Sequence, residues 1–169
     1  MPAHHVNKII DTLVYNETMI LYVSATQGEA AQVPSDYPLI VTGIGIIRAT
    51  LALTEYLARA DELPERIINF GTAGSLDGNT GIFEIDHVFQ HDFDHKVIEQ
   101  IIGKPFPNGI DLPIVSTLPA ARLATGDSFV NDPDTRARLA QQAQLCDMEG
   151  YAIAFVTMEI GRASCRERV

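Results

Sequence analysis

Short apolar segments alternate along the chain with segments in which apolar residues recur at helical spacing. Residues 19–25 (M-I-L-Y-V-S-A) and 38–45 (P-L-I-V-T-G-I-G) are nearly all apolar, as expected of strands buried on both faces of a sheet. Over residues 46–60 the apolar side chains recur every three or four positions and form one stripe, and Pro64 follows. This part of the chain therefore predicts two strands followed by a helix.

The rest of the chain continues this alternation. Further strands are predicted at residues 66–70, 82–90, 112–117 and 123–130, with a last short strand at Met148. Asp132 and Pro133 predict the N-cap and first residue of a helix that continues to about Leu145. From Tyr151 onward the chain is apolar and helical. The pattern predicts a single α/β domain, a three-layer sandwich around a mixed, largely parallel sheet.

Composition narrows the class of partner. A chain of 169 residues with 46% hydrophobic and 20% charged residues fits one globular domain. No apolar run reaches the roughly 18 residues needed to span a bilayer, and no signal-peptide pattern precedes the first strand. The net charge of −10 disfavours nucleic acid and anionic membranes. A small neutral or cationic ligand fits this net charge better. Two cysteines make no disulfide framework, so we expect a cytoplasmic protein.

The last ten residues differ from the rest of the chain. Residues 160–169 (I-G-R-A-S-C-R-E-R-V) are abruptly basic and resemble the in-frame translation of a sequencing adaptor. A helix ending in arginines is the alternative, because the helix dipole favours cations there. On the adaptor interpretation the natural domain is residues 1–159 and is incomplete. Without this segment's three arginines and one glutamate the net charge changes from −10 to −12.

Two glycine-containing turns follow predicted strands. Residues 43–45 (G-I-G) form part of a nucleotide-binding fingerprint, but Arg48 stands where its third glycine belongs. A tight strand-to-helix turn is the simpler interpretation. At residues 71–74 (G-T-A-G) the backbone N–H groups and the Thr72 hydroxyl could face a ligand, since open α/β folds bind ligands at the carboxyl ends of their strands.

Acidic and aromatic residues near the predicted strand ends are candidates for a binding site. Glu29 follows the first strand and is either a general base or a residue that favours a helix N-terminus. Glu149 lies between Met148 and an apolar helix, and a buried carboxylate there needs partners such as ribose hydroxyls. Phe129 offers a ring for stacking, although core packing is the default for phenylalanine. Such a set suits a purine nucleoside.

Three histidines recur every four residues within an acidic segment. They are His87, His91 and His95, interspersed with Asp86, Asp92 and Asp94. This spacing brings side chains together only on a helix, whereas residues 83–89 predict a strand that runs into a loop. We therefore expect no metal site and no cofactor, and a polar segment that faces solvent or a subunit contact.

Six short motifs occur in the order of one known family. They are A-x-x-x-E at 25–29, S/T-G-I-G at 42–45, N-x-G-[ST]-A-G at 69–74, H-D-x-D at 91–94, G-D-[AS]-F-[IV] at 126–130 and [ED]-M-E-[AG] at 147–150. Over residues 19–158 the chain thus resembles the 5′-methylthioadenosine/S-adenosylhomocysteine nucleosidases of the purine nucleoside phosphorylase superfamily. Each motif is weak alone, and their shared order makes the resemblance specific.

The resemblance implies roles for the residues around the sugar. Glu29 matches the carboxylate that activates the attacking water, and Glu149 matches the acid that binds the ribose hydroxyls. Met148 matches the side chain that covers the ribose, and Asp147 replaces the glutamate that usually precedes it.

The resemblance also implies a site for the base. Phe129 matches the ring that stacks on adenine, and Val130 the residue whose backbone holds the edge of the base. Three residues, Thr72, Ala73 and Gly74, match the turn beside the sugar.

The implied reaction is hydrolysis of the N-glycosidic bond of such purine nucleosides in methionine salvage, which releases adenine, by a homodimer. Phosphorolysis is the near alternative, but phosphorylases typically have arginine where Asn69 stands. A futalosine-type hydrolase, a general purine nucleosidase and a non-catalytic nucleoside-binding module remain open. The aspartate that protonates the leaving base in this family belongs to an S-D-x-A-D motif, which this sequence does not contain.

Overall fold

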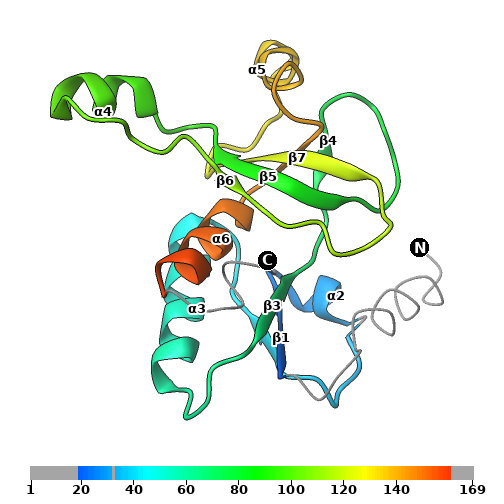
Figure 1. Ribbon diagram of the computed structural model, residues 1–169. Helices are drawn as coiled ribbons and strands as arrows, with labels where there is room; N and C mark the ends of the chain where they lie inside the picture. The colour runs from blue at the N-terminus through cyan, green and yellow to red at the C-terminus, as the bar shows by residue number, and fades with distance from the viewer. Residues whose placement is uncertain (1–18, 32, 161–169) are drawn as a thin grey trace.

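The computed structural model describes residues 19–31 and 33–160, whose strands form two hydrogen-bonded sheets (Figure 1). The three-stranded sheet has the order β2-β1-β3 and contains β1 (Ile20–Ser24), β2 (Leu39–Val41) and β3 (Arg66–Asn69). The five-stranded sheet has the order β4-β8-β7-β5-β6 and contains β4 (Gly74–Ser75), β5 (Glu84–Gln90), β6 (Ile110–Asp111), β7 (Ala120–Thr125) and β8 (Leu145–Asp147). Residues 161–169, most of the proposed adaptor segment, lie outside the described residues, as do residues 1–18 and 32.

Most strand pairs are parallel. In the smaller sheet β1 pairs in parallel with both neighbours, and in the larger sheet β5, β7 and β8 are parallel. The edge strands β4 and β6 are antiparallel to their partners. The predicted fold class, a mixed and largely parallel α/β sheet structure, is confirmed. Between β3 and β4 the chain passes from the smaller sheet to the larger one. In this connection the Thr72 N–H donates to the Glu29 carboxylate.

Five helices are described. They are α2 (Gln27–Ala30), α3 (Ile46–Arg59), α4 (His95–Ile102), α5 (Pro133–Leu139) and α6 (Gly150–Glu159). Helix α6 packs against α3 and β3 on one side and against β5, β6 and β7 on the other (Figure 1). Its Ile153 joins the core of the smaller sheet and its Ala154 that of the larger sheet. A helix between two apolar surfaces is apolar all round, which explains the sequence of α6.

Several predicted elements are confirmed. The structure contains β1, β3, β5, α3 and α6 within one or two residues of the predicted bounds. Asp132 is the N-cap of α5, with its carboxylate accepting the Thr135 N–H at 2.7 Å, and Pro133 is the first helical residue. The helices α2 and α4 and the two-residue strands β4 and β6 were not predicted.

Other predicted elements are absent or have the wrong bounds, among them the strand predicted at residues 38–45, which ends at Val41. Residues 112–117 are not a strand, since Pro113 lacks an N–H and the Glu84 carboxylate accepts the N–H groups of Val115 and Ser116. The strand β7 ends at Thr125 instead of 130, and α5 ends at Leu139 instead of Leu145. Met148 follows β8 rather than lying in it.

Candidate active site

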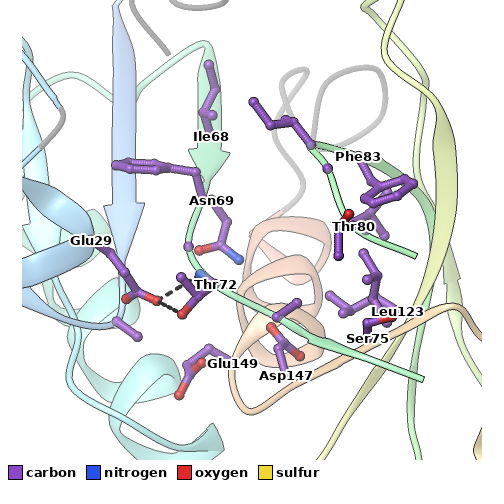
Figure 2. A pocket seen from close by; sticks show the side chains of 18 of the residues that line it. Glu29, Ile68, Asn69, Thr72, Ser75, Thr80, Phe83, Leu123, Asp147 and Glu149 are labelled. Atoms are coloured by element: carbon purple, nitrogen blue, oxygen red, sulfur yellow. Dashed lines mark hydrogen bonds between the residues drawn. The ribbon is translucent and has the colours of Figure 1, made fainter. Parts of the chain in front are cut away.

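Glu29 is held by Thr26, in its own turn of the chain, and by Thr72, 43 residues further along. Its Oε2 accepts the N–H of Thr26 at 3.0 Å and the Thr26 hydroxyl at 2.9 Å, while the Glu29 N–H donates to that hydroxyl. This is a capping box at the start of α2. Its Oε1 accepts the Thr72 N–H at 2.8 Å and the Thr72 hydroxyl at 2.7 Å (Figure 2). Four donors therefore converge on one carboxylate.

These hydrogen bonds decide the charge of Glu29. Partial burial acts to raise the pKa of the carboxyl, but the four donors from Thr72 and Thr26 favour the ionised form more strongly, so its pKa lies below the usual value. Glu29 is therefore a carboxylate at neutral pH. A base must be unprotonated before it can accept a proton, and Glu29 meets that condition.

Glu149 is in a different environment. It lies between β8 and α6, and its Oε1 accepts the Gly45 N–H at 2.7 Å, at the start of α3. Burial raises its pKa, the Gly45 hydrogen bond lowers it, and the negative charges of Asp147 and Glu29 raise it, with a net increase. The neighbouring N–H of Ile46 donates to Asp127 at 2.8 Å. Two carboxylates thus share the N-terminus of α3.

Asp147 is fixed at the end of β8 by its hydrogen bonds. Its Oδ1 accepts the hydroxyl of Thr125 at 2.5 Å, and its Oδ2 accepts the Gly150 N–H at 2.7 Å. The Thr125 hydroxyl in turn accepts the Tyr151 N–H at 3.0 Å, which ties β7 to the start of α6. Burial raises the pKa of the Asp147 carboxyl more strongly than these hydrogen bonds lower it, so its pKa lies above the usual value.

A cavity of about 500 Å³ opens at the carboxyl ends of the parallel strands. Figure 2 shows Glu29, Thr72, Asp147 and Glu149 gathered in one part of it, with Phe83 and Leu123 across from them. The apolar part also includes side chains of both sheets, Tyr22, Ile68, Phe70, Ile85 and Leu145. The cavity therefore combines a region of carboxylates and hydroxyls with an aromatic and aliphatic region.

The structure brings together five of the nine predicted site residues. Cavity-lining members of that set are Glu29, Thr72, Ala73, Asp147 and Glu149. Gly74 lies beside them in β4, where a Cβ atom would come within 2.9 Å of the Cys146 Sγ. Its backbone can pair with β8 at this distance because it has no side chain.

The other three predicted residues do not line this cavity. Phe129 is 76% exposed, Val130 packs beside the buried Leu139, and Met148 is half-buried between β8 and α6. The segment that carries Phe129 is held next to Asp92, which does not line this cavity, because the Ser128 N–H donates to the Asp92 carboxylate at 3.1 Å. The stacking and ribose-covering roles of these side chains stay predictions.

The histidine series is dispersed by the fold. His87 lies in β5 and contacts Asp111 at 2.6 Å, whereas His95 is buried at the start of α4 beside the rings of Phe93 and Phe106. Within residues 19–31 and 33–160, no three His, Cys, Asp or Glu side chains are grouped so that they could hold a metal ion.

Sequence reasoning assigned no role to three residues of the site. Gly45 and Asp127 belong to the motifs at 42–45 and 126–130, but their contacts in the site are tertiary and no local pattern predicts those contacts. Thr26 is different, because a threonine three residues before a glutamate at a helix start is a recognisable capping box.

Solved structures share this fold. The 5′-methylthioadenosine/S-adenosylhomocysteine nucleosidase of Helicobacter pylori aligns with a TM-score of 0.70 and 19% identity over 88% of this chain and 82% of that chain. The futalosine hydrolase of the same organism aligns with a TM-score of 0.68 and 21% identity, over 85% and 79%. The chain therefore shares the α/β fold of these two proteins.

Sequence comparison identifies the family. The model of the phosphorylase superfamily matches residues 35–165, and the chain belongs to this superfamily. A 5′-methylthioadenosine/S-adenosylhomocysteine nucleosidase of Marinomonas sp. is 28% identical over 148 residues, which cover 75% of this chain and 63% of that protein. The chain thus spans less than two thirds of this relative's length.

Proposed function

We propose that the protein hydrolyses the N-glycosidic bond of 5′-thio purine nucleosides of the methylthioadenosine and S-adenosylhomocysteine type, releasing adenine. The carrying observation is that Glu29 and Glu149 line one cavity while their surroundings shift their pKa values in opposite directions. The names of the curated relatives support the substrate class.

The geometry suits the chemistry of glycosyl transfer. Cleavage of the bond gives the ribose oxocarbenium character, which nearby carboxylates stabilise. In the proposed step a water oxygen attacks the anomeric carbon, Glu29 takes the water proton, and the bonding electron pair leaves with the purine. Glu149 holds the ribose hydroxyls. The purine takes up one proton, which balances the proton that Glu29 accepts from the water, so one water is consumed for each bond cleaved.

Hydrolysis is favoured over phosphorolysis by the charge of the cavity. Among the described residues that line it, three are carboxylates and none is Lys, Arg or His. Asn69, which stands where phosphorylases typically have arginine, contributes only a neutral amide. Phosphate would be repelled here, because like charges a few ångströms apart disfavour each other.

Release of free adenine tests the proposal. Purified protein is incubated with methylthioadenosine, S-adenosylhomocysteine, adenosine and futalosine, each with and without phosphate. We expect phosphate-independent release from the first two substrates. Release that requires phosphate would replace hydrolysis by phosphorolysis. A rise in melting temperature with these ligands but no product would instead indicate a nucleoside-binding module.

We also propose that two copies associate through α3. Two large apolar side chains of its N-terminal half are exposed at helical spacing, Ile47 (77%) and Leu51 (63%), and Ile44 (57%), just before the helix, is exposed as well. Such a stripe is typical of an interface. Sedimentation should give a dimer, and Ile47→Asp should give a folded monomer. A wild-type monomer at micromolar concentration would contradict the proposal.

The domain limits and the cellular site are proposals as well. We propose a cytoplasmic enzyme of methionine salvage whose natural sequence departs from this one after Glu159. In the described part of the chain, no helix is long and apolar enough to cross a membrane. Sequencing the gene beyond the Glu159 codon tests the domain limit, and cell fractionation tests the location.

A further inference from the structure

Thr26 makes three hydrogen bonds with Glu29 that have no role in the proposed reaction as described above. Its hydroxyl accepts the Glu29 N–H at 3.3 Å and donates to Glu29 Oε2 at 2.9 Å, so one side chain both caps α2 and binds the carboxylate. Its own N–H donates to the same oxygen at 3.0 Å. Thr26 therefore accounts for every hydrogen bond recorded for Oε2 in the described structure.

The two carboxylate oxygens of Glu29 have different surroundings. Oε2 is turned to the half-buried Thr26, at the first turn of α2, whereas Oε1 is turned to Thr72, which is exposed at the cavity (Figure 2). Each oxygen accepts one hydroxyl and one backbone N–H, but Thr72 lines the cavity and Thr26 does not. Cavity water can therefore take the place of the Thr72 hydroxyl more easily than that of the Thr26 hydroxyl, so Oε1 is the oxygen that receives a proton from such a water.

We infer that Thr26 is a positioning residue for Glu29, which holds Oε2 against α2 so that Oε1 faces the cavity. The inference rests on the proposed role of Glu29 as the base. Thr26 touches no substrate in this account and acts only through the carboxylate. Its hydroxyl also helps to keep Glu29 ionised, because it donates to the charged form.

A purely structural role for Thr26 predicts something different. If the threonine serves only as an N-cap, any residue that accepts the Glu29 N–H will replace it. Three variants separate the two roles. Thr26→Ser keeps the acceptor and the donor, Thr26→Val removes both, and Thr26→Asp keeps the acceptor but, when ionised, donates nothing to Oε2 and adds a like charge.

The first measurement needs no turnover. With ¹³C-labelled glutamate side chains, the carboxyl signal of Glu29 is assigned through Glu29→Gln and followed against pH in each variant. Loss of a donor to a carboxylate raises its pKa, so we expect the midpoint to rise in Thr26→Val, to rise further in Thr26→Asp, and to stay in Thr26→Ser. A Thr26→Asp midpoint equal to that of the wild type would overturn the inference, whatever the stability of Thr26→Val.

The second measurement uses the proposed reaction. The acid limb of the pH profile of kcat/KM should move to higher pH in Thr26→Val and Thr26→Asp. At the wild-type midpoint, kcat/KM of Thr26→Val and Thr26→Asp should be about three- to tenfold lower than that of the wild type, whereas Thr26→Ser should keep the wild-type value. An unmoved acid limb would contradict the positioning role. If no substrate is turned over by any variant, the proposed function fails, and the titration still decides whether Thr26 controls Glu29.

Discussion

Glu29 and Glu149 face the same cavity, but the two carboxylates accept different hydrogen bonds and have different neighbouring charges. Glu29 accepts four hydrogen bonds from two threonines, and these outweigh partial burial, so its pKa is lowered. Glu149 accepts the Gly45 N–H and is close to two other carboxylates, so burial and repulsion outweigh its hydrogen bonds and raise its pKa. Burial and like charges at Glu149, and the four donors at Glu29, together separate the pKa values of the two acids.

The largest expected effect comes from removing the ionised member of the pair. Glu29→Gln should lower kcat/KM for adenine release by about 10²- to 10⁴-fold, because a general base contributes that much. Glu55→Gln, at the exposed i,i+4 pair with Arg59, is the control and should change activity less than twofold. Equal rates for the two variants would remove Glu29 from the mechanism.

The next effect concerns the support of Glu149. Gly45 has φ of 102° and ψ of 156°, a conformation nearly restricted to glycine, and a Cβ atom there would lie 3.0 Å from Asp127 Oδ1. Gly45→Ala should therefore destabilise the fold by about 1–3 kcal/mol in urea denaturation. Gly28→Ala, inside α2 and nearly free of close neighbours, should be neutral or slightly stabilising. Similar effects from both would mean that the Gly45 turn is not strained.

A third test sharpens the comparison at Asp147. Thr125→Val keeps the shape of a fully buried side chain but removes the hydroxyl that joins Asp147 to the Tyr151 N–H. We expect a loss of about 1–3 kcal/mol, because two polar groups lose a partner. Thr157→Val, which removes a buried hydroxyl bonded to the Ile153 carbonyl of its own helix, should cost less. The reverse order would contradict the linking role of Thr125.

The smallest effect is the pH dependence of stability. The pKa of Glu149 is raised on folding, so stability should fall as pH rises from its unfolded pKa through its folded pKa. The pKa of Glu29 is lowered, so its contribution is lost as pH falls from its unfolded pKa through its folded pKa. Glu149→Gln should reduce the first slope, to which Asp147 also contributes, and Glu29→Gln should reduce the second, to which Asp92 also contributes, in denaturation curves from about pH 3 to 8. An unchanged slope in either variant would contradict the assigned direction.

Local sequence predicted the elements that carry the site better than the contacts within it. The run of apolar residues at β1, the stripe of α3 and the Asp132-Pro133 start of α5 each follow from one segment alone. The contact between Gly45 and Glu149 joins residues 104 positions apart, so no local pattern encodes it. Phe129 is exposed because the segment after β7 is held by the hydrogen bond from the Ser128 N–H to Asp92. The general preference of phenylalanine for the core does not predict this contact.

The position of α6 between the sheets has a consequence for amide hydrogen exchange. No ladder joins the two sheets in the described part of the chain, and α6 packs against both. Opening one sheet away from the other must therefore expose α6, so its central amides should exchange only through the largest openings of the molecule. Glu29 and Glu149 lie in one part of the cavity, beside the smaller sheet and the start of α6, and Phe83 and Leu123 lie across from them. A nucleoside that fills the cavity would therefore connect the same two halves and slow that exchange further.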